Sequence, residues 1–351
     1  MRVKRLLAGE TFAGRYRVEG FLGQGAMGSV YRAVEIGTGE PRALKVMSAD
    51  IANAPDFLER FLLEAKIGER IASDHVVRVF DSGSDDKSRL PYLAMELLEG
   101  TDLHRMIEGG AVLHADLGRE LVAQLFQAMR AAHAANVVHR DLKPENLFLV
   151  TSTSGPPTLK VLDFGVAKVV RETTAGGTAP GLGTPLWAAP EQGKEGQNIR
   201  PSADVWALGL LTYRLLAGKI FWKGATAKTS NAFDLAIEML REPIPLASER
   251  SREIGARDLG PLFDAWFARA VDRDPTRRHR DAGEAWAALE AAWRGDATEP
   301  ETAERGSAAN LASTAAASPT SASPSSRRAL VALGLALVLA LVLGLWLTLR
   351  G

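Results

Sequence analysis

The amino-acid sequence predicts an α+β fold for residues 16–293, followed by one transmembrane helix near its carboxyl end. Residues 16–21 and 29–36 alternate between apolar and polar side chains, which is typical of half-buried strands. Longer segments farther along the chain carry apolar residues at helical spacing. Residues 329–349 contain no charge over 21 positions, a length close to that needed to cross a bilayer.

The composition excludes several classes of function. The 42 basic and 42 acidic residues balance to a net charge of zero, so no overall basic field attracts nucleic acid. Cysteine is absent, which excludes disulfides, thiolate metal sites and a cysteine nucleophile. The six histidines lack the spacing of metal ligands, so no zinc site is expected. Residues 1–15 begin with a basic segment without the apolar core of a secretory signal, and we expect an N-terminal extension there.

A glycine-rich segment lies between the first two expected strands, in the sequence YRVEGFLGQGAMGSVYRA at residues 16–33. Its glycines follow the G-x-G-x-x-G spacing, and the alternation resumes after the last of them. We therefore expect a hairpin whose backbone N–H groups can lie close over phosphates. A simple tight turn is the alternative, but it does not require three glycines at this spacing. The residues expected at the nucleotide here are Leu22, Gly23, Gln24, Gly25, Ala26, Met27, Gly28, Ser29 and Val30.

A lysine interrupts the apolar strand expected at RALKVM, residues 42–47. Lys45 on a core strand is costly unless its charge is paired. Glu64 is the candidate partner, because it lies beside the apolar stripe of a helix expected around residues 56–71. Such a pair would hold the ammonium group toward nucleotide phosphates. Glu64 as an ordinary solvated helix residue remains an open alternative.

Residues 137–149, VVHRDLKPENLFL, place two acids, three bases and an asparagine between apolar segments. Val137 and Val138 on one side, and residues 147–149 on the other, are expected to form short buried strands. Reactive groups on a loop that a scaffold holds in place are typical of active sites. The segment 116–138 contains a helix that leads into this loop, with one face formed by Leu117, Leu121, Leu125, Met129 and Ala132.

Further motifs follow in a fixed order: HRDLKPEN at residues 139–146, DFG at 163–165, APE at 189–191 and DVWALG at 204–209. Together with the glycine-rich segment, Lys45 and the arginine of DPTRR, they resemble the eukaryotic-type (Hanks-type) protein kinase family. The resemblance covers residues 16–293 and implies a bilobal protein kinase fold, with an antiparallel β-rich N-lobe at 16–98 and a mainly helical C-lobe at 99–293. DFGVAK and the C-terminal apolar segment resemble bacterial membrane-anchored serine/threonine protein kinases.

The resemblance assigns catalytic roles within the loop. Asp141 would accept the proton of the acceptor hydroxyl and orient that group, and Lys143 would lie near the transferring phosphate. Asn146 and Asp163 supply the oxygen ligands that suit Mg²⁺, with Mn²⁺ as an alternative. His139 is expected to support the phenylalanine of DFG rather than to act as a base.

ATP is the cofactor that the resemblance implies, bound in a cleft between the two lobes. Lys45 and Glu64 are its expected catalytic ion pair. Met95 followed by Glu96, Leu97 and Leu98 fits the hinge, and Glu96 and Leu98 are expected to bind adenine through their backbone groups.

Serine or threonine is the expected acceptor. Lys143 two residues after Asp141 resembles the serine/threonine branch, and Thr184 occupies the position at which that branch sets a hydroxyl near the catalytic aspartate. Residues 166–187 form the expected activation loop, whose phosphate would pair with Arg140. Threonines that simply populate a polar loop remain the alternative. The expected phosphorylation sites are Thr178 first, then Thr173 and Thr174.

Three further residues have structural roles by the same resemblance. Glu191 and Arg278 form a buried ion pair that ties the substrate lobe together. Asp204 braces the catalytic-loop backbone from the start of an apolar helix. The chain departs from the family at Trp187, where tyrosine is usual, which changes the lining of the acceptor site.

The carboxyl end predicts attachment to a membrane. Residues 294–328 are rich in alanine, serine and proline and form a flexible juxtamembrane linker. Residues 329–349 span the bilayer, and the two arginines before the span place the kinase domain in the cytoplasm, leaving residues 350–351 as an extracytoplasmic tail. We expect a single-pass protein of the cytoplasmic (inner) membrane. A ridge of small residues allows a homodimer, although chance explains it equally well: Ala332, Ala336, Ala340 and Gly344.

The expected function is therefore a membrane-anchored kinase that phosphorylates serine or threonine of protein substrates in signalling. A pseudokinase scaffold would be indicated by loss of Lys45, Asp141, Asn146 or Asp163, and all four are present. A small-molecule phosphotransferase of related fold would lack the APE segment and Lys143. Both alternatives fit the sequence less well.

Overall fold

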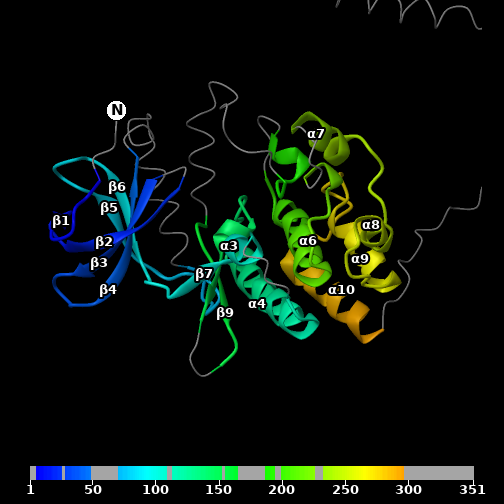
Figure 1. The fold of residues 1–351 in the computed structure, drawn as a ribbon, viewed down its shortest axis with the longest axis horizontal. Helices are drawn as coiled ribbons and strands as arrows, with labels where there is room; N and C mark the ends of the chain where they lie inside the picture. The colour runs from blue at the N-terminus through cyan, green and yellow to red at the C-terminus, as the bar shows by residue number, and fades with distance from the viewer. Residues whose placement is uncertain are drawn as a thin grey trace, which may run out of the picture. The chain divides into compact units, whose positions relative to one another are not determined.

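The structure is a computed structural model in which the chain divides into two units, Met1–Ala297 and Thr298–Gly351. The first unit begins with strands and continues into a mainly helical part, as Figure 1 shows. The strand-rich lobe and the helical lobe expected from the sequence are thus confirmed. The described residues are 5–25, 28–48, 70–108, 113–151, 155–164, 186–193, 199–225 and 232–295.

The N-lobe contains a six-stranded antiparallel sheet with the strand order β1-β2-β3-β4-β6-β5. Alternation explains its first strands, since Tyr16 and Val18 are buried whereas Arg17 and Glu19 are exposed. β1 lies inside residues 1–15, so the sheet begins earlier than the boundary at residue 16. The strands are β1 (Thr11–Phe12), β2 (Tyr16–Gly25), β3 (Gly28–Glu35), β4 (Pro41–Met47), β5 (Val79–Ser84) and β6 (Pro91–Met95).

A second sheet has three strands, β7 (Gly100–Asp102), β8 (Leu147–Val150) and β9 (Thr158–Val161), and its central strand β8 directly follows the catalytic loop. The strand expected at 147–149 is confirmed. The strand expected at Val137 and Val138 is wrong, because the Val137 N–H donates to the carbonyl of Ala132 at 2.9 Å and so continues from the end of a helix.

The C-lobe is built around helix α6 (Ser202–Ala217), in which 15 of 16 residues are buried. Beside it lies α4 (Ala115–Ala134), which buries Leu121, Leu125 and Met129 on the face expected from the sequence. Burial of such apolar side chains is the main stabilising term of this lobe. The other helices are α3 (Leu103–Glu108), α7 (Ala232–Leu240), α8 (Ala247–Ile254), α9 (Pro261–Ala270) and α10 (Ala282–Arg294), with short 3₁₀ turns η1 (Pro144–Asn146), η2 (Pro190–Gly193) and η3 (Lys223–Ala225).

Several expectations lie outside the described residues. They include residues 56–69 of the helix expected at 56–71, most of the activation loop, the linker from residue 296 onward and the span at 329–349. Within the described ranges, no helix has both the length and the apolar character needed to cross a bilayer.

Candidate active site

The backbone of the loop that carries Asp141 is held by hydrogen bonds to one buried carboxylate. Asp204, at the start of α6, accepts hydrogen bonds from the backbone N–H groups of His139 and Arg140, both at 2.8 Å. Arg140 has a φ of 68°, in the left-handed region that residues other than glycine seldom adopt. Backbone in this region costs about 1–3 kcal/mol and persists only where the surroundings enforce it. Asp204 therefore has the bracing position expected from the sequence.

His133 of α4 supports Asp204 in turn, a role that the sequence did not indicate. Its Nε2 lies 2.9 Å from Asp204 Oδ2, and its Nδ1 lies 2.9 Å from the backbone nitrogen of Ala282. Because the Ala282 N–H can only donate, Nδ1 is the acceptor and Nε2 carries the proton that Asp204 accepts. Burial opposes ionisation of Asp204, but the hydrogen bonds from His133 and Arg140 outweigh it, so its pKa lies below the usual range.

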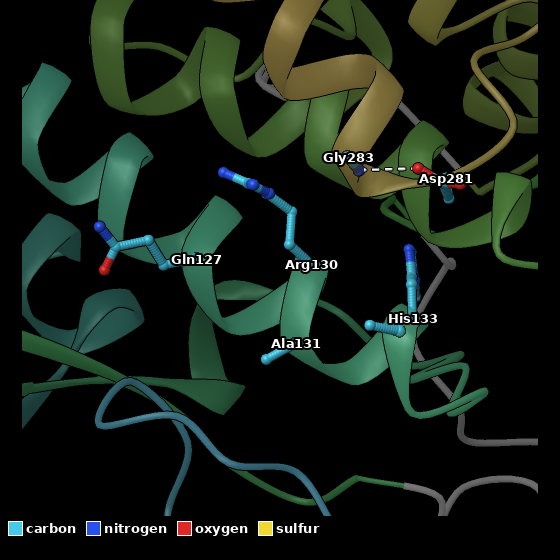
Figure 2. Close-up of a pocket in the computed structure, with 7 residues that line it drawn as sticks. Gln127, Arg130, Ala131, His133, Asp281 and Gly283 are labelled. Atoms are coloured by element: carbon cyan, nitrogen blue, oxygen red, sulfur yellow. Dashed lines mark hydrogen bonds between the residues drawn. The ribbon is translucent and has the colours of Figure 1, made fainter.

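Figure 2 shows His133 on α4 close to Asp281 and Gly283, where α10 begins. Asp281 caps that helix by accepting hydrogen bonds from the backbone of Gly283 and Glu284. A cavity of about 600 Å³ is lined by His133, Arg130 and Asp281 among others, and by none of the residues expected at the nucleotide. The support of the catalytic loop thus reaches α10 through this histidine.

The side chains expected to act on the acceptor converge on Asp141. Lys143 Nζ donates to Asp141 Oδ2 at 2.8 Å, and Asn146 Nδ2 donates to the same oxygen at 3.2 Å and to the Asp141 carbonyl at 2.7 Å. The other carboxylate oxygen, Oδ1, receives neither of these bonds and is the atom suited to an acceptor hydroxyl. The sequence placed these three residues together correctly in space, while their catalytic roles stay predictions.

His139 is a support rather than a base in this arrangement. Its Nε2 lies 2.8 Å from the carbonyl of Leu162, and its Nδ1 accepts from the Asp141 N–H at 3.2 Å. The ring is therefore the neutral Nε2–H tautomer, with both nitrogens engaged. It also packs on Phe164, with ring centroids 4.6 Å apart. The contact with the phenylalanine of DFG is the one expected from the sequence.

Lys45 of β4 reaches from the N-lobe to Asp163, with Nζ 2.6 Å from Oδ1. Burial alone would raise the pKa of Asp163, but the charge and hydrogen bond of Lys45 hold it below its usual range. Asp163 has a φ of 58°, a second strained backbone position at this site. The sequence did not predict this ion pair. The expected partner Glu64 lies outside the described residues.

Asn146 and Asp163 form a donor set that fits Mg²⁺. Asn146 uses its amide nitrogen toward Asp141, which leaves its Oδ1 as a ligand, and Asp163 keeps Oδ2 free of the Lys45 bond. Both are hard oxygen donors, and Mg²⁺ usually adds substrate phosphates to one or two such groups. Among the described residues, no group of three or more His, Asp or Glu has a metal-binding arrangement. The ion would neutralise phosphate charge.

The glycine-rich segment forms the hairpin expected from the sequence, since β2 and β3 pair as far as Gly25 opposite Gly28. A Cβ at Gly28 would lie 2.1 Å from the carbonyl oxygen of Val46, so only glycine fits against β4. Among the described residues, no heavy atom lies within 4 Å of a Cβ built at Gly23 or Gly25. Their backbone therefore has room for phosphates. Leu22 and Gln24 are exposed and Ser29 is buried, whereas Ala26 and Met27 lie outside the described residues.

The expected hinge continues from β6 beside an apolar cluster. Met95 is buried, and Leu98, Val30 and Leu162 pack partly exposed against the same cluster. Partly buried apolar groups from both lobes suit the faces of an adenine ring. The Glu96 N–H donates to the carbonyl of Arg78 at 2.9 Å, so the group of Glu96 that can meet adenine is its carbonyl.

Arg278 and Glu191 form the buried pair expected from the sequence. Arg278 donates through Nη1 and Nη2 to the two oxygens of Glu191, at 2.7 and 2.8 Å. Next in the chain, Gln192 donates to the Arg140 carbonyl at 2.7 Å and accepts from the N–H of Ala189 at 2.9 Å. Gln192 was not predicted, and its place directly after the APE motif is the only signal that could have found it.

The activation-loop expectations lie outside the described residues, which cover only the end of that segment. Thr173, Thr174, Thr178 and Thr184 all belong to the part that is not described. Trp187 is described and packs partly buried against the C-lobe core.

Comparison with known proteins places this geometry in context. The family described as "Protein kinase domain" matches residues 16–278. The chain is 35% identical over 279 residues to the serine/threonine-protein kinase PknL of Mycobacterium bovis, which covers 79% of this chain and 65% of that protein. It is 37% identical over 239 residues to the serine/threonine-protein kinase Pkn1 of Myxococcus xanthus, covering 67% of this chain and 33% of Pkn1.

Among solved structures, the kinase domain of Mycobacterium tuberculosis PknI matches with a TM-score of 0.61 and 27% identity. That match covers 82% of this chain and 99% of the PknI chain. By contrast, this chain spans between a third and about two thirds of the length of PknL and Pkn1. The similarity therefore concerns the part that contains both lobes and the candidate site.

Proposed function

Because this chain belongs to the protein kinase family, we propose that it transfers the γ-phosphate of ATP to serine or threonine hydroxyls of proteins. We further propose that residues 329–349 hold it at a membrane and that autophosphorylation activates it in signalling. The observation that supports the transfer most strongly is the convergence of Lys143 and Asn146 on the Asp141 carboxylate, at 2.8 and 3.2 Å.

The proposed reaction follows from these positions. The acceptor oxygen forms a bond to the γ-phosphorus while the bond from that phosphorus to the bridging oxygen breaks and leaves ADP. Asp141 orients the hydroxyl and takes its proton, and Lys143 offsets the charge on the transferring group. Lys45 binds phosphate oxygens from the N-lobe side, in exchange for part of its present contact with Asp163. A Mg²⁺ ion held by Asn146 and Asp163 would neutralise phosphate charge.

The choice of serine or threonine rests on Lys143, two residues after Asp141, and on the similarity to PknL and Pkn1, which are named serine/threonine-protein kinases. The proposal for Thr184 beside the acceptor has the same basis.

Autophosphorylation is proposed for Thr178 first, and for Thr173 and Thr174 second. Arg140 supports this proposal because its backbone is fixed by Asp204 and Gln192 next to the catalytic aspartate. A phosphate that pairs with its guanidinium would tie the activation loop to the catalytic loop.

Attachment to a membrane rests on the 21 uncharged residues at 329–349, preceded by a linker and two arginines. We propose a single-pass protein of the cytoplasmic membrane whose kinase domain faces the cytoplasm. Residues 332, 336, 340 and 344 provide the small side chains for association of two such helices.

The full chain in detergent tests the catalytic proposal when it is incubated with Mg²⁺ and radiolabelled ATP, with a generic serine/threonine substrate added. Wild type is expected to label itself and the substrate, with phosphate mapped by mass spectrometry to Thr178 or its neighbours. Asp141→Asn is expected to lose both signals while keeping the thermal unfolding temperature. Labelling that survives in Asp141→Asn would overturn the assignment of this residue.

Deletion of residues 329–349 tests the membrane proposal separately. The truncated chain should appear in the soluble fraction. Wild type should remain in the membrane pellet after extraction with alkaline carbonate. Kinase activity per folded molecule should be unchanged. A wild-type chain released by carbonate would contradict the span.

A further inference from the structure

A single ion pair connects the expected hinge to the strand that leads to Asp163. Glu96 follows the last residue of β6, and Lys160 lies in β9, three residues before Asp163. Lys160 Nζ donates to Glu96 Oε2 at 2.8 Å, across 64 residues of sequence. No local pattern in the sequence relates these two residues, and neither has a part in the proposed phosphoryl transfer.

Glu96 is held at its backbone as well as at its side chain. Its N–H donates to the Arg78 carbonyl at 2.9 Å, and its side chain binds Lys160. With the nitrogen and the carboxylate both engaged, the direction of the Glu96 carbonyl is restricted. This carbonyl is the group that the proposed function assigns to adenine.

The backbone of β9, which carries Lys160, is fixed by hydrogen bonds on both sides. The neighbouring Val161 N–H donates to the His75 carbonyl at 2.8 Å, and the Val77 N–H donates to the Val161 carbonyl at 3.0 Å. Val161 also pairs with Leu147 of β8. These backbone bonds fix β9 independently of the Lys160 side chain. Loss of that side chain should therefore leave the presentation of Asp163 intact.

The pair is better shielded from water than an ordinary surface pair. The side chains of Lys160 and Glu96 are 14% and 31% exposed, whereas those of Arg32 and Glu19 in the N-lobe sheet are 47% and 37% exposed. Shielding strengthens the attraction between opposite charges. Both Lys160 and Glu96 also line a cavity of about 850 Å³, so packing does not enclose them on every side. Glu96 Oε2 also accepts from the Arg78 N–H, but at 3.5 Å that hydrogen bond is much longer than the one from Lys160.

We propose that Lys160 is a positioning residue for the nucleotide: through the carboxylate of Glu96 it holds the hinge carbonyl in the direction that adenine requires. This inference rests on the proposed function, because it presumes ATP in the cleft between the lobes. It concerns the adenine end only. At the phosphate end, the hydrogen bonds described for the catalytic loop join Asp141, Lys143 and Asn146 to one another and do not involve Lys160.

The test compares Lys160→Met and Glu96→Gln with the double variant and with the reversed pair, Lys160→Glu with Glu96→Lys, all in the full chain. Arg32→Met is the matched control, since it breaks a more exposed pair that lies within the N-lobe sheet. Two quantities are measured: KM and kcat for ATP on a generic serine/threonine substrate, and Kd for ADP by calorimetry. Thermal unfolding without nucleotide identifies any variant that fails to fold.

Loss of the pair is expected to raise KM for ATP and Kd for ADP by about five- to ten-fold in Lys160→Met and in Glu96→Gln, as one well-placed charged contact allows. kcat should stay within about two-fold, since the groups that act on the phosphate are untouched. The double variant should be no weaker than either single variant, and the reversed pair should recover most of the affinity. Arg32→Met should match wild type.

Additive losses in the double variant would overturn the proposal, as would a fall in kcat with KM and Kd unchanged, or a Lys160→Met variant that behaves like Arg32→Met. If wild type binds ADP but transfers no phosphate, the proposed function fails while the ADP measurements still decide the role of the pair. If wild type binds no nucleotide, both proposals fail.

Discussion

At the scale of single residues, the candidate site depends on buried groups whose hydrogen bonds leave little freedom. Asp204 accepts from two successive backbone N–H groups and from His133. We expect Asp204→Asn to place an amide where a carboxylate accepted these bonds, leaving at least one buried donor without an acceptor. Such a loss costs about 1–3 kcal/mol. The variant should unfold at lower denaturant concentration and lose kcat about ten-fold or more, because the strained backbone of Arg140 relaxes.

The exposed Asp86 provides the control for this change, since Asp86→Asn removes the same charge from a surface turn. It should leave both the denaturation midpoint and kcat at wild-type values. Equal effects of Asp204→Asn and Asp86→Asn would contradict the bracing role of Asp204. Steady-state kinetics and urea unfolding on the same samples separate loss of folding from loss of loop geometry.

His279 predicts how stability changes with pH. It is 1% exposed, its ring nitrogens have no hydrogen-bond partner among the described residues, and its ring stacks on Trp266. Burial, assisted by the charge of Arg269 and opposed by Glu284 and Asp281, lowers the pKa of His279 from 6.5 to about 4. Between these values the unfolded chain binds a proton that the folded chain does not, so the free energy of unfolding falls as pH falls, by about 3 kcal/mol in all.

His279→Phe isolates this contribution from that of other acid-sensitive groups. The variant keeps an aromatic ring but cannot bind the proton. From pH 7 to pH 4, the free energy of unfolding of wild type should therefore fall by about 3 kcal/mol more than that of the variant. Urea unfolding at half-unit intervals of pH measures it. A difference that stays constant over this range would show that His279 does not titrate as argued.

At the scale of elements, two glycines of the glycine-rich hairpin differ sharply in the space available for a side chain. A side chain at Gly28 would collide with the Val46 carbonyl, whereas a Cβ at Gly25 would have no heavy atom of the described part of the chain within 4 Å. We expect Gly28→Ala to force β3 away from β4 and to cost about 3 kcal/mol of unfolding free energy. Gly25→Ala should be neutral or slightly stabilising. Similar unfolding curves for the two variants would refute the close approach of β3 to β4.

The elements also show which parts of the fold the sequence could predict. Alternation identified the hairpin, and helical spacing identified α4, because each pattern reports burial within one continuous segment. β1 has only two residues, too few for a period. Val137 and Val138 resembled a strand because an apolar pair before a polar loop has the same pattern whether it joins a sheet or follows a helix.

The candidate site divides in the same way. Motif spacing predicted that Asp141, Lys143 and Asn146 lie together, since the first and the last are only five positions apart in the sequence. The links from Lys45 to Asp163 and from His133 to Asp204 join residues 118 and 71 positions apart. No local pattern specifies such pairs, because they arise only when the two lobes and their helices have packed. The motifs identified Lys45, Asp163 and Asp204, but they indicated neither His133 nor the pairing of Lys45 with Asp163.

At the scale of the whole first unit, the Lys45 to Asp163 bond is a direct side-chain link between β4 and the segment that follows β9. A nucleotide bound with Mg²⁺ would contact both lobes and should stabilise the unit as a whole. At 100 times its dissociation constant, a ligand that binds only the folded state adds about 2.7 kcal/mol. For a unit of this size, we expect Tm to rise by about 4–5 °C with a non-hydrolysable ATP analogue and Mg²⁺.

Asp163→Asn separates the nucleotide from the metal in this experiment. The variant keeps one oxygen but loses the charge that suits the ion, and Lys45 becomes available to phosphates. The rise in Tm with analogue and Mg²⁺ should therefore fall to the value that wild type shows with analogue and EDTA, while that smaller rise is retained. If Mg²⁺ stabilises Asp163→Asn as much as wild type, the ion is held elsewhere. If the analogue has no effect on wild type, the first unit does not bind ATP as proposed.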